Sequence, residues 1–281
     1  MNVSALASAS PALDERSLYL RRLVMDALVH GGRGHVGSAL SLIEIVRVLY
    51  DDVLNVRPHE PRWADRDRFI LSKGHGCLAL YAVLADRGFF DVAALKTFCH
   101  TNSFLGGHPE YGKIPGVEAS TGALGHGLSI GLGMALAARR QRRKSRVFVV
   151  LGDGELNEGS VWEACMAATK HKLSNLIAIV DSNKLQAYGP VDSVMSLDPL
   201  PAKFSSFGFA VQEVDGHDVA QLRHVLTTLD EETPKPQMII CHTVKGKGIP
   251  AAEFNSDWHH KSRFKSEELD LVRVALGGEH A

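Results

Sequence analysis

Residues 146–154 read RVFVVLGDG, and residues 176–183 read LIAIVDSN. Each segment begins with a continuous apolar run, which is typical of a β-strand buried on both faces of a parallel sheet. Residues 156–171 between them carry a helical pattern, so the three segments predict a βαβ unit. Strand, helix and strand patterns recur near 210–214, 219–229 and 238–241. This alternation predicts an α/β fold with a doubly wound, mostly parallel sheet and helices on both faces.

The amino-terminal half of the chain is predicted to be mostly helical. Asp14 is placed to cap a helix that ends at Gly31-Gly32, because glycine suits the left-handed position after a helix. The other elements expected here are a strand at 68–71 and helices at 41–54, 75–87 and 125–143. Residues 100–122 have no periodic pattern, but their interleaved apolar and histidine positions favour a functional loop over disorder. We expect a loose tail at 1–13 and a single domain at 14–281.

Composition narrows the classes of function. The 281 residues include 31 Lys and Arg against 32 Asp and Glu, so a net charge of -1 gives no overall attraction for nucleic acid or an anionic membrane. The basic run at 139–146 falls where a helix is expected to end, which favours a solvated helix end over an RNA patch. No segment resembles a signal peptide or a membrane span, and the four cysteines are widely spaced. A reduced, cytoplasmic setting is therefore the expectation.

Polar residues follow both of the central apolar runs. Asp153 lies between two glycines after the first run, and Asn183 follows the second. The carboxyl ends of parallel strands meet at one edge of a sheet, so we expect these two side chains to lie close together. Their oxygens, with a nearby backbone carbonyl, suit Mg²⁺ or Ca²⁺, and a helix beginning just after Gly154 would favour a phosphate at the same place. A metal–diphosphate site is predicted, in preference to a simple tight turn.

Several of the 14 histidines lie in loops beside glycine. Imidazole at such positions suits proton transfer near neutral pH and hydrogen bonding to hydroxyl groups. No carboxylate or cysteine spacing marks these histidines as a zinc set. The loop histidines are His35, His75, His108, His126, His217 and the pair His259 and His260.

Seven motifs in family order make the sequence similar to the amino-terminal, diphosphate-binding half of a transketolase. They cover nearly the whole chain beyond residue 14. The motifs are GRGHVG at 32–37, LSKGHG at 71–76, GGHPE at 106–110, PGVEASTGALG at 115–125, GDGELNEGSVWEA at 152–164, DSNKLQ at 181–186 and VDGHD at 214–218.

This resemblance implies the thiamine diphosphate-binding fold for 14–281, with thiamine diphosphate and Mg²⁺, or alternatively Ca²⁺, as cofactors. It implies that the metal ligands are Asp153, the side chain of Asn183 and the carbonyl of Leu185. It places Gly122 and Leu124 near the aminopyrimidine.

The same resemblance assigns the histidines. His75 and His259, with Gly154, match positions that contact the diphosphate. His35, His108 and His259 match the histidines around the sugar hydroxyls and the proton relay, and they are the expected catalytic residues. Glu158 and Glu163 resemble acidic residues at a subunit interface.

Three positions depart from the family pattern. Ser182 precedes Asn183 where asparagine or aspartate is usual, His126 stands where glutamine is common, and His260 replaces a glycine after the Trp-His pair. The last change bears on the acceptor side of the pocket.

No segment matches the pyrimidine-binding domain of transketolases, which carries their activating glutamate. We therefore expect the amino-terminal subunit of a split transketolase, inactive alone and working as an α₂β₂ assembly with a carboxy-terminal subunit that supplies this domain. It would transfer a two-carbon ketol fragment from a ketose donor to an aldose acceptor, and we expect both sugars to be phosphorylated. The alternatives are a subunit of a deoxyxylulose phosphate synthase or of an α-ketoacid dehydrogenase, and a non-catalytic cofactor-binding subunit.

Overall fold

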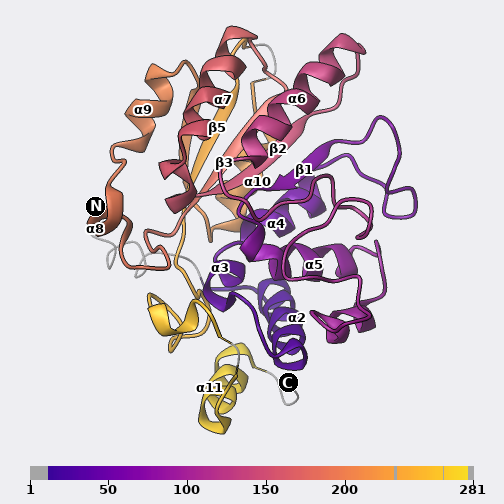
Figure 1. The fold of residues 1–281 in the computed structure, drawn as a ribbon, viewed down its shortest axis with the longest axis vertical. Coiled ribbons are helices and arrows are strands. Elements are labelled where there is room, and N and C mark those ends of the chain that lie inside the picture. The colour runs from indigo at the N-terminus through magenta and orange to yellow at the C-terminus, as the bar shows by residue number, and fades with distance from the viewer. Residues whose placement is uncertain (1–11, 231–232, 262, 278–281) are drawn as a thin grey trace.

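A five-stranded parallel sheet forms the centre of the protein (Figure 1). The computed structural model describes residues 12–230, 233–261 and 263–277. The strand order is β1-β2-β3-β5-β4. The strands are β1 (Arg68–Leu71), β2 (Val147–Gly152), β3 (Leu176–Ser182), β4 (Ala210–Asp215) and β5 (Gln237–His242). All five strand predictions are confirmed, whereas residues 1–11 of the predicted tail lie outside the described residues.

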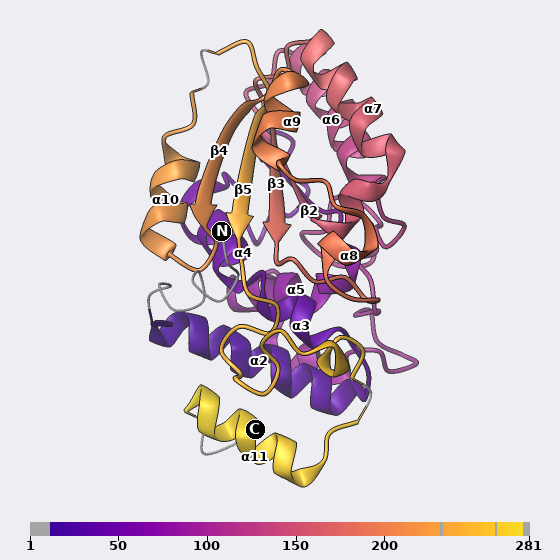
Figure 2. The same ribbon diagram turned by 90° about the vertical axis from the view of Figure 1, so that its left-hand side faces the viewer.

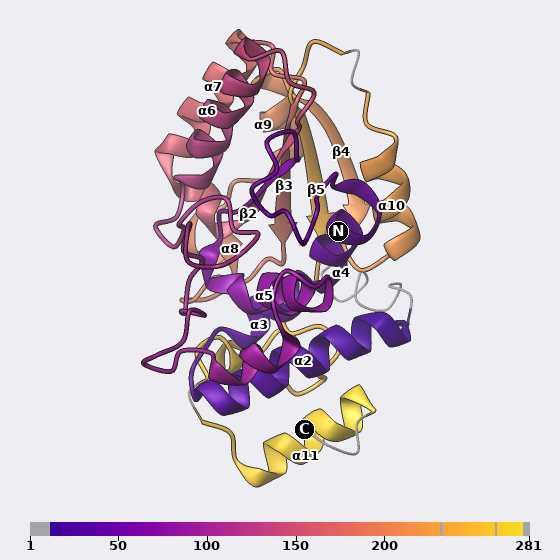
Figure 3. The same cartoon turned by 90° about the vertical axis from the view of Figure 1, so that its right-hand side faces the viewer.

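Helices cover both faces of this sheet, as the apolar runs predict. One face packs against α6 (Gly127–Arg140), α7 (Gly159–Lys170) and α9 (Leu200–Ser206), and these helices lie together on one side of the sheet in Figures 2 and 3. The other face packs against α10 (Val219–Thr227) and the amino-terminal helices. Each face of the sheet has its own hydrophobic core, and alternate residues of β2 point into opposite cores. Val147 and Val149 belong to the core beneath α6, α7 and α9, and Phe148 and Val150 belong to the core on the other face.

The amino-terminal helices pack beyond the carboxyl ends of the strands (Figure 2). Helix α2 (Glu15–Gly31) begins at the predicted cap, where Asp14 accepts a hydrogen bond from the Ser17 N–H, and ends at a left-handed Gly32. The predicted helix at 75–87 is α5 (Cys77–Asp86). The predicted helix at 41–54 is instead α4 (Ile43–Val48) followed by a π-helical turn (Leu49–Val53). A separate short helix that was not predicted, α3 (Val36–Leu40), precedes α4 across a break at 41–42. One reason for the break is that the Ser41 hydroxyl turns inward to the buried Asp181 carboxylate (2.6 Å).

The predicted helix at 156–171 also begins later than expected. A 3₁₀ turn covers Gly154–Asn157, and α7 starts only at Gly159. The physical reason is that the buried Glu155 carboxylate accepts hydrogen bonds from the N–H groups of Gly125 (2.8 Å) and Gly152 (3.0 Å), which holds this turn against the sheet. The expectation of a helix N-terminus directly after Gly154 is therefore wrong. Glu158 is the N-cap residue of α7, not a member of the helix.

Besides α3, three α-helices in the described part of the chain were not expected from the sequence. They are α8 (Val191–Met195), α9 and α11 (Ser266–Leu276). Helix α11 lies beside α2 in Figure 2, where the Leu276 carbonyl accepts a hydrogen bond from Arg22 (2.8 Å). Within the described residues, no helix is both long and apolar enough to cross a membrane.

Candidate active site

The two predicted strand ends meet at one cavity. Gly152 and Asp181 are paired in register at the ends of β2 and β3, which brings the residues that follow them together. The cavity has a volume of about 260 Å³. It is lined by every site residue that the sequence predicts: His35, His75, His108, Gly122, Leu124, Asp153, Gly154, Asn183, Leu185 and His259.

Asp153 is held by backbone amides. One carboxylate oxygen accepts a hydrogen bond from the Gly154 N–H (2.8 Å), and the other accepts one from the Lys184 N–H (2.5 Å). Burial, and then the neighbouring Asp181 carboxylate, raise the pKa of Asp153 above its ordinary value. Burial and a second nearby carboxylate both disfavour the charged form of Asp153, and a bound cation would favour that form.

Asn183 and Leu185 complete a set of oxygen donors. The Asn183 side-chain amide donates to Asp181 (3.3 Å), while its oxygen accepts a hydrogen bond from the Leu185 N–H (3.2 Å). The Asn183 amide group is therefore oriented, and Asp153, Asn183 and Leu185 all line the same cavity. Such a donor set fits a hard cation such as Mg²⁺ or Ca²⁺.

A buried ion pair lies behind this set. Lys73 follows β1 and binds the carboxylate of Asp181 at the end of β3, and their side chains are only 1% and 0% exposed. Burial would raise the pKa of Asp181, but the Lys73 ammonium and hydrogen bonds from Ser41 and Thr243 outweigh it and lower this pKa. Sequence analysis missed both residues, although each one stands at a strand end.

A second lysine enters the cavity from the loop after β5. The Lys245 ammonium donates to the Leu185 carbonyl (2.8 Å), one of the predicted metal ligands. Burial, and then the nearby Lys73 ammonium, lower the pKa of Lys245 to about 8. The cavity therefore combines carboxylate and carbonyl oxygens with two buried ammonium groups, which suits a ligand made of a cation and phosphate groups.

A buried network fixes the loop that carries Lys245. The Glu44 carboxylate pairs with Arg21 (2.6 and 3.0 Å) and lies 2.8 Å from His217 Nδ1. His217 Nε2 accepts a hydrogen bond from the Val244 N–H (2.8 Å), so Nδ1 carries the proton and donates to Glu44. His217 thus has a structural place outside the cavity.

Four histidines surround the cavity. The ring of His35 lies 5.3 Å from that of His75, 5.6 Å from that of His259 and 6.4 Å from that of His108, centroid to centroid. Burial is the main cause that lowers the pKa of His35 to about 4 and of His259 to about 3, and it holds the pKa of His75 well below its usual range. These three imidazoles are neutral at pH 7 and each offers one donor and one acceptor to a ligand.

The irregular segment at 100–122 is anchored from α5. The Cys77 thiol donates to the Gly107 carbonyl (3.2 Å), and the Tyr81 hydroxyl donates to the Gly106 carbonyl (3.0 Å). Gly122 has a φ of 136°, and a Cβ there would lie 2.9 Å from the His108 ring. Only glycine therefore fits at this position without displacing His108.

Comparison with known proteins identifies the family. Residues 14–281 match the family described as transketolase, thiamine diphosphate binding domain. The chain belongs to the transketolase family. The expected cofactor class, thiamine diphosphate, is confirmed at the level of this domain.

The similar curated proteins include transketolase subunits of matching length. An apulose-4-phosphate transketolase subunit from Phocaeicola vulgatus is 40% identical over 253 residues, which are 90% of each chain. Its namesake from Actinobacillus succinogenes is 42% identical over 271 residues, 95% of this chain and 96% of that protein. A 6-deoxy-6-sulfo-D-fructose transketolase subunit from Clostridium sp. is 38% identical over 263 residues, 94% of this chain and 95% of that protein.

Solved transketolases share the fold. A Pichia stipitis transketolase in complex with sedoheptulose 7-phosphate matches 94% of this chain with a TM-score of 0.87 and 31% identity. The Campylobacter jejuni transketolase matches 99% with a TM-score of 0.85 and 31% identity. The chain covers only 40% and 43% of these two proteins.

Two residues that depart from the transketolase pattern, His126 and His260, lie in different environments. His126 is exposed at the N-cap of α6, where its Nδ1 lies 3.0 Å from the Leu124 carbonyl. His260 lies at the site itself, with its ring 4.2 Å from that of His35. It lines a second hollow of about 470 Å³, and His35, His75 and His108 border both hollows.

Proposed function

We propose that this chain binds the diphosphate end of thiamine diphosphate through a divalent cation and acts as the amino-terminal subunit of a two-subunit transketolase. The convergence of all ten predicted site residues on one cavity carries this proposal. When bound, the cofactor supplies an electron sink that lets a carbon–carbon bond beside a carbonyl break. The residues of this chain would bind and orient the cofactor and the sugar, and exchange protons with the sugar hydroxyls.

Asp153, Asn183 and Leu185 are the proposed ligands of Mg²⁺, with Ca²⁺ as an alternative. Their oxygens are the hard donors that these ions take, and a bound cation would favour the charged form of the buried Asp153 carboxylate. The cation would screen the diphosphate from the Asp153 and Asp181 carboxylates. His75, Gly154 and His259 are proposed to contact the diphosphate, and the backbone of Gly122 and Leu124 to approach the aminopyrimidine.

His35, His108 and His259 are the proposed catalytic residues. His35 and His259 are neutral at pH 7 because of their lowered pKa values, so each ring can accept a hydrogen bond from a sugar hydroxyl through one nitrogen or donate one through the other. His108 borders both hollows and stands on an anchored loop, which suits a residue that holds a hydroxyl of the donor sugar.

The proposed partner is a carboxy-terminal transketolase subunit that carries the pyrimidine-binding domain. The names of relatives with matching length, which call them subunits, support this arrangement. These names also favour ketol transfer over the other thiamine-dependent reactions. We propose an α₂β₂ assembly, phosphorylated ketose and aldose substrates and a cytoplasmic location. Glu158 and Glu163, both exposed, stay proposed interface residues.

Reconstitution tests this proposal. The purified chain should show no ketol transfer from xylulose 5-phosphate or hydroxypyruvate at any cofactor concentration. Addition of the partner subunit should produce activity that depends on thiamine diphosphate and Mg²⁺, with a mass near two copies of each chain by light scattering. Full activity of this polypeptide alone would contradict the two-subunit proposal.

A further inference from the structure

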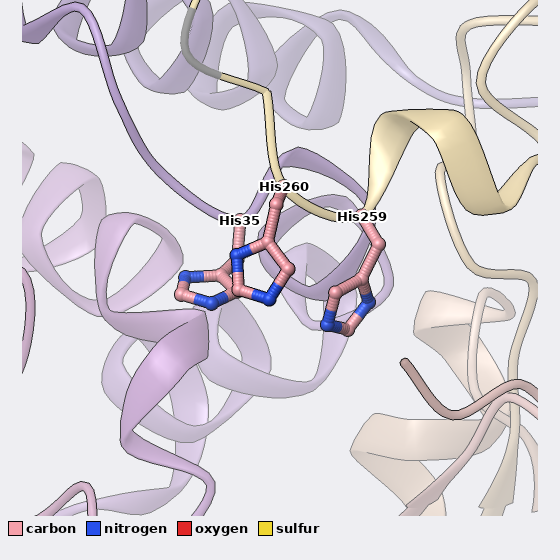
Figure 4. Close-up of side chains that lie close together, drawn as sticks. All are labelled: His35, His259 and His260. Atoms are coloured by element: carbon pink, nitrogen blue, oxygen red, sulfur yellow. The ribbon is translucent and has the colours of Figure 1, made fainter. Parts of the chain in front are cut away.

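The imidazole side chains of His35, His259 and His260 come from two loops and lie close together (Figure 4). His35 comes from the loop between α2 and α3, and His259 and His260 follow a 3₁₀ turn at Ser256–Trp258. One ring nitrogen of each histidine lies within 4.8 Å of those of the other two. The ring centroids are 4.2 Å apart for His35 and His260, 4.6 Å for His259 and His260, and 5.6 Å for His35 and His259.

The backbone holds the two loops together. The Lys261 N–H donates to the Gly34 carbonyl (3.2 Å), one residue beyond His260 and one before His35. His259 Nδ1 is buried and has no hydrogen-bond partner within the described residues, so no side-chain bond from this atom locks the ring. Ligand nitrogens of a tetrahedral zinc ion stand about 3.3 Å apart, for Zn–N bonds of about 2.05 Å. Side-chain rotation that moves the ring nitrogens by about 1–2 Å would close the cluster to this spacing.

We propose that His35, His259 and His260 bind a transition-metal dication of the zinc type where the two hollows share lining residues. The sequence alone does not indicate this site, because the ligands have no zinc-type spacing and His35 lies far from the pair. The third ligand, His260, stands where the transketolase pattern has glycine. The inference concerns metal binding by this chain and does not depend on ketol transfer.

The chemistry of the cluster selects the ion. Three imidazole nitrogens and no carboxylate suit Zn²⁺, Cu²⁺, Ni²⁺ or Co²⁺, whereas Mg²⁺ and Ca²⁺ take oxygen ligands. The Lys73 and Lys245 ammonium groups repel any dication. Only an ion that forms strong bonds to imidazole should therefore stay.

Because of the position of the three histidines, a metal ion bound to them would affect the proposed active site. His35 borders both hollows, His259 the smaller one and His260 the larger one. An ion bound to all three histidines would stand at the border of the two hollows and would engage two of the proposed catalytic residues, His35 and His259. If the proposed function is right, the ion inhibits the assembled enzyme in competition with the donor sugar.

Cobalt titration of the full chain tests the site. The chain is held in millimolar Mg²⁺ to occupy oxygen ligands, and Co²⁺ is added while visible absorption reports tetrahedral coordination. We expect one equivalent to bind with an intense tetrahedral band, and Zn²⁺ to displace it. His260→Gly should weaken binding at least tenfold and His35→Asn should do so too.

Three controls separate this site from others. His171→Ala removes an exposed histidine far from the cluster, Cys99→Ser removes the thiol that borders the larger hollow, and Asp153→Asn alters the oxygen site. All three should bind Co²⁺ as the wild type does. Absence of a tetrahedral band, or equal affinity in His260→Gly and the wild type, would overturn the proposal. These readouts need no turnover, so they stand even if reconstitution yields no transketolase activity.

Discussion

Removal of the Lys73 ammonium should lower the free energy of unfolding, because the buried Asp181 carboxylate then has no counter-ion. Lys73→Met leaves the Asp181 carboxylate, which is 0% exposed, without its counter-ion. Breaking a buried pair from one side costs about 3–5 kcal/mol. The hydrogen bonds from Ser41 and Thr243 remain in place, so we expect a loss near the lower end, about 3 kcal/mol in the free energy of unfolding.

Urea denaturation of the chain, followed by circular dichroism, measures this loss. Lys113→Met is the matched control, because Lys113 and its partner Glu110 are 45% and 48% exposed. Such a surface pair contributes about 0–1 kcal/mol. The double variant Lys73→Met/Asp181→Asn removes both charges and should recover a large part of the loss, since no uncompensated charge stays buried.

The pH dependence supplies an independent check. In the wild type the pKa of Asp181 is below its ordinary value, so the pair's contribution is present above the unfolded-state pKa and is lost as pH falls through the folded-state pKa. In Lys73→Met burial acts unopposed by the ammonium and raises this pKa, so the folded state takes up a proton as pH falls. The stability deficit of Lys73→Met relative to the wild type should therefore shrink as pH falls through the raised folded-state pKa toward the unfolded-state pKa. A loss under about 1 kcal/mol, or a double variant whose loss equals the sum of the single losses, would refute the reasoning.

Three further predictions concern the cavity. Asp153→Ala should abolish Mg²⁺-dependent binding of thiamine diphosphate in the assembled enzyme, because the diphosphate would then face Asp181 unscreened; calorimetric titration that finds unchanged affinity would remove Asp153 from the metal site. His108→Ala should lower kcat and raise the KM of the donor through a lost hydrogen bond of about 1–3 kcal/mol, with cofactor affinity nearly unchanged, whereas loss of cofactor binding would make the residue structural. Gly122→Ala should lower the unfolding free energy by about 1–3 kcal/mol through its positive φ and its contact with the His108 ring, which thermal denaturation measures; an unchanged melting temperature would contradict the glycine requirement.

Much of the sheet could be predicted because local pattern and tertiary environment agree there. The runs at 147–152 and 176–182 are apolar at nearly every position, and strands buried on both faces are the only strands that require this. The start of the helix after β2 could not be predicted. Its first turn depends on Glu155, whose carboxylate is bound by Gly125 and Gly152, and a contact across 30 residues leaves no mark on helical periodicity.

Local sequence was enough to establish the family motifs, the succession of strands along the chain and the site residues that follow strands, such as Asp153 and Asn183. Strand-end positions converge in any parallel sheet, so their chemistry can be read from local order alone. Only the folded chain shows which groups from distant parts of the sequence complete the site. It pairs Lys73 with Asp181 across 108 residues, turns Lys245 onto the Leu185 carbonyl and sets His260 against His35. These contacts depend on how separate loops pack over the sheet edge, and that packing is a property of the whole fold rather than of any segment in it.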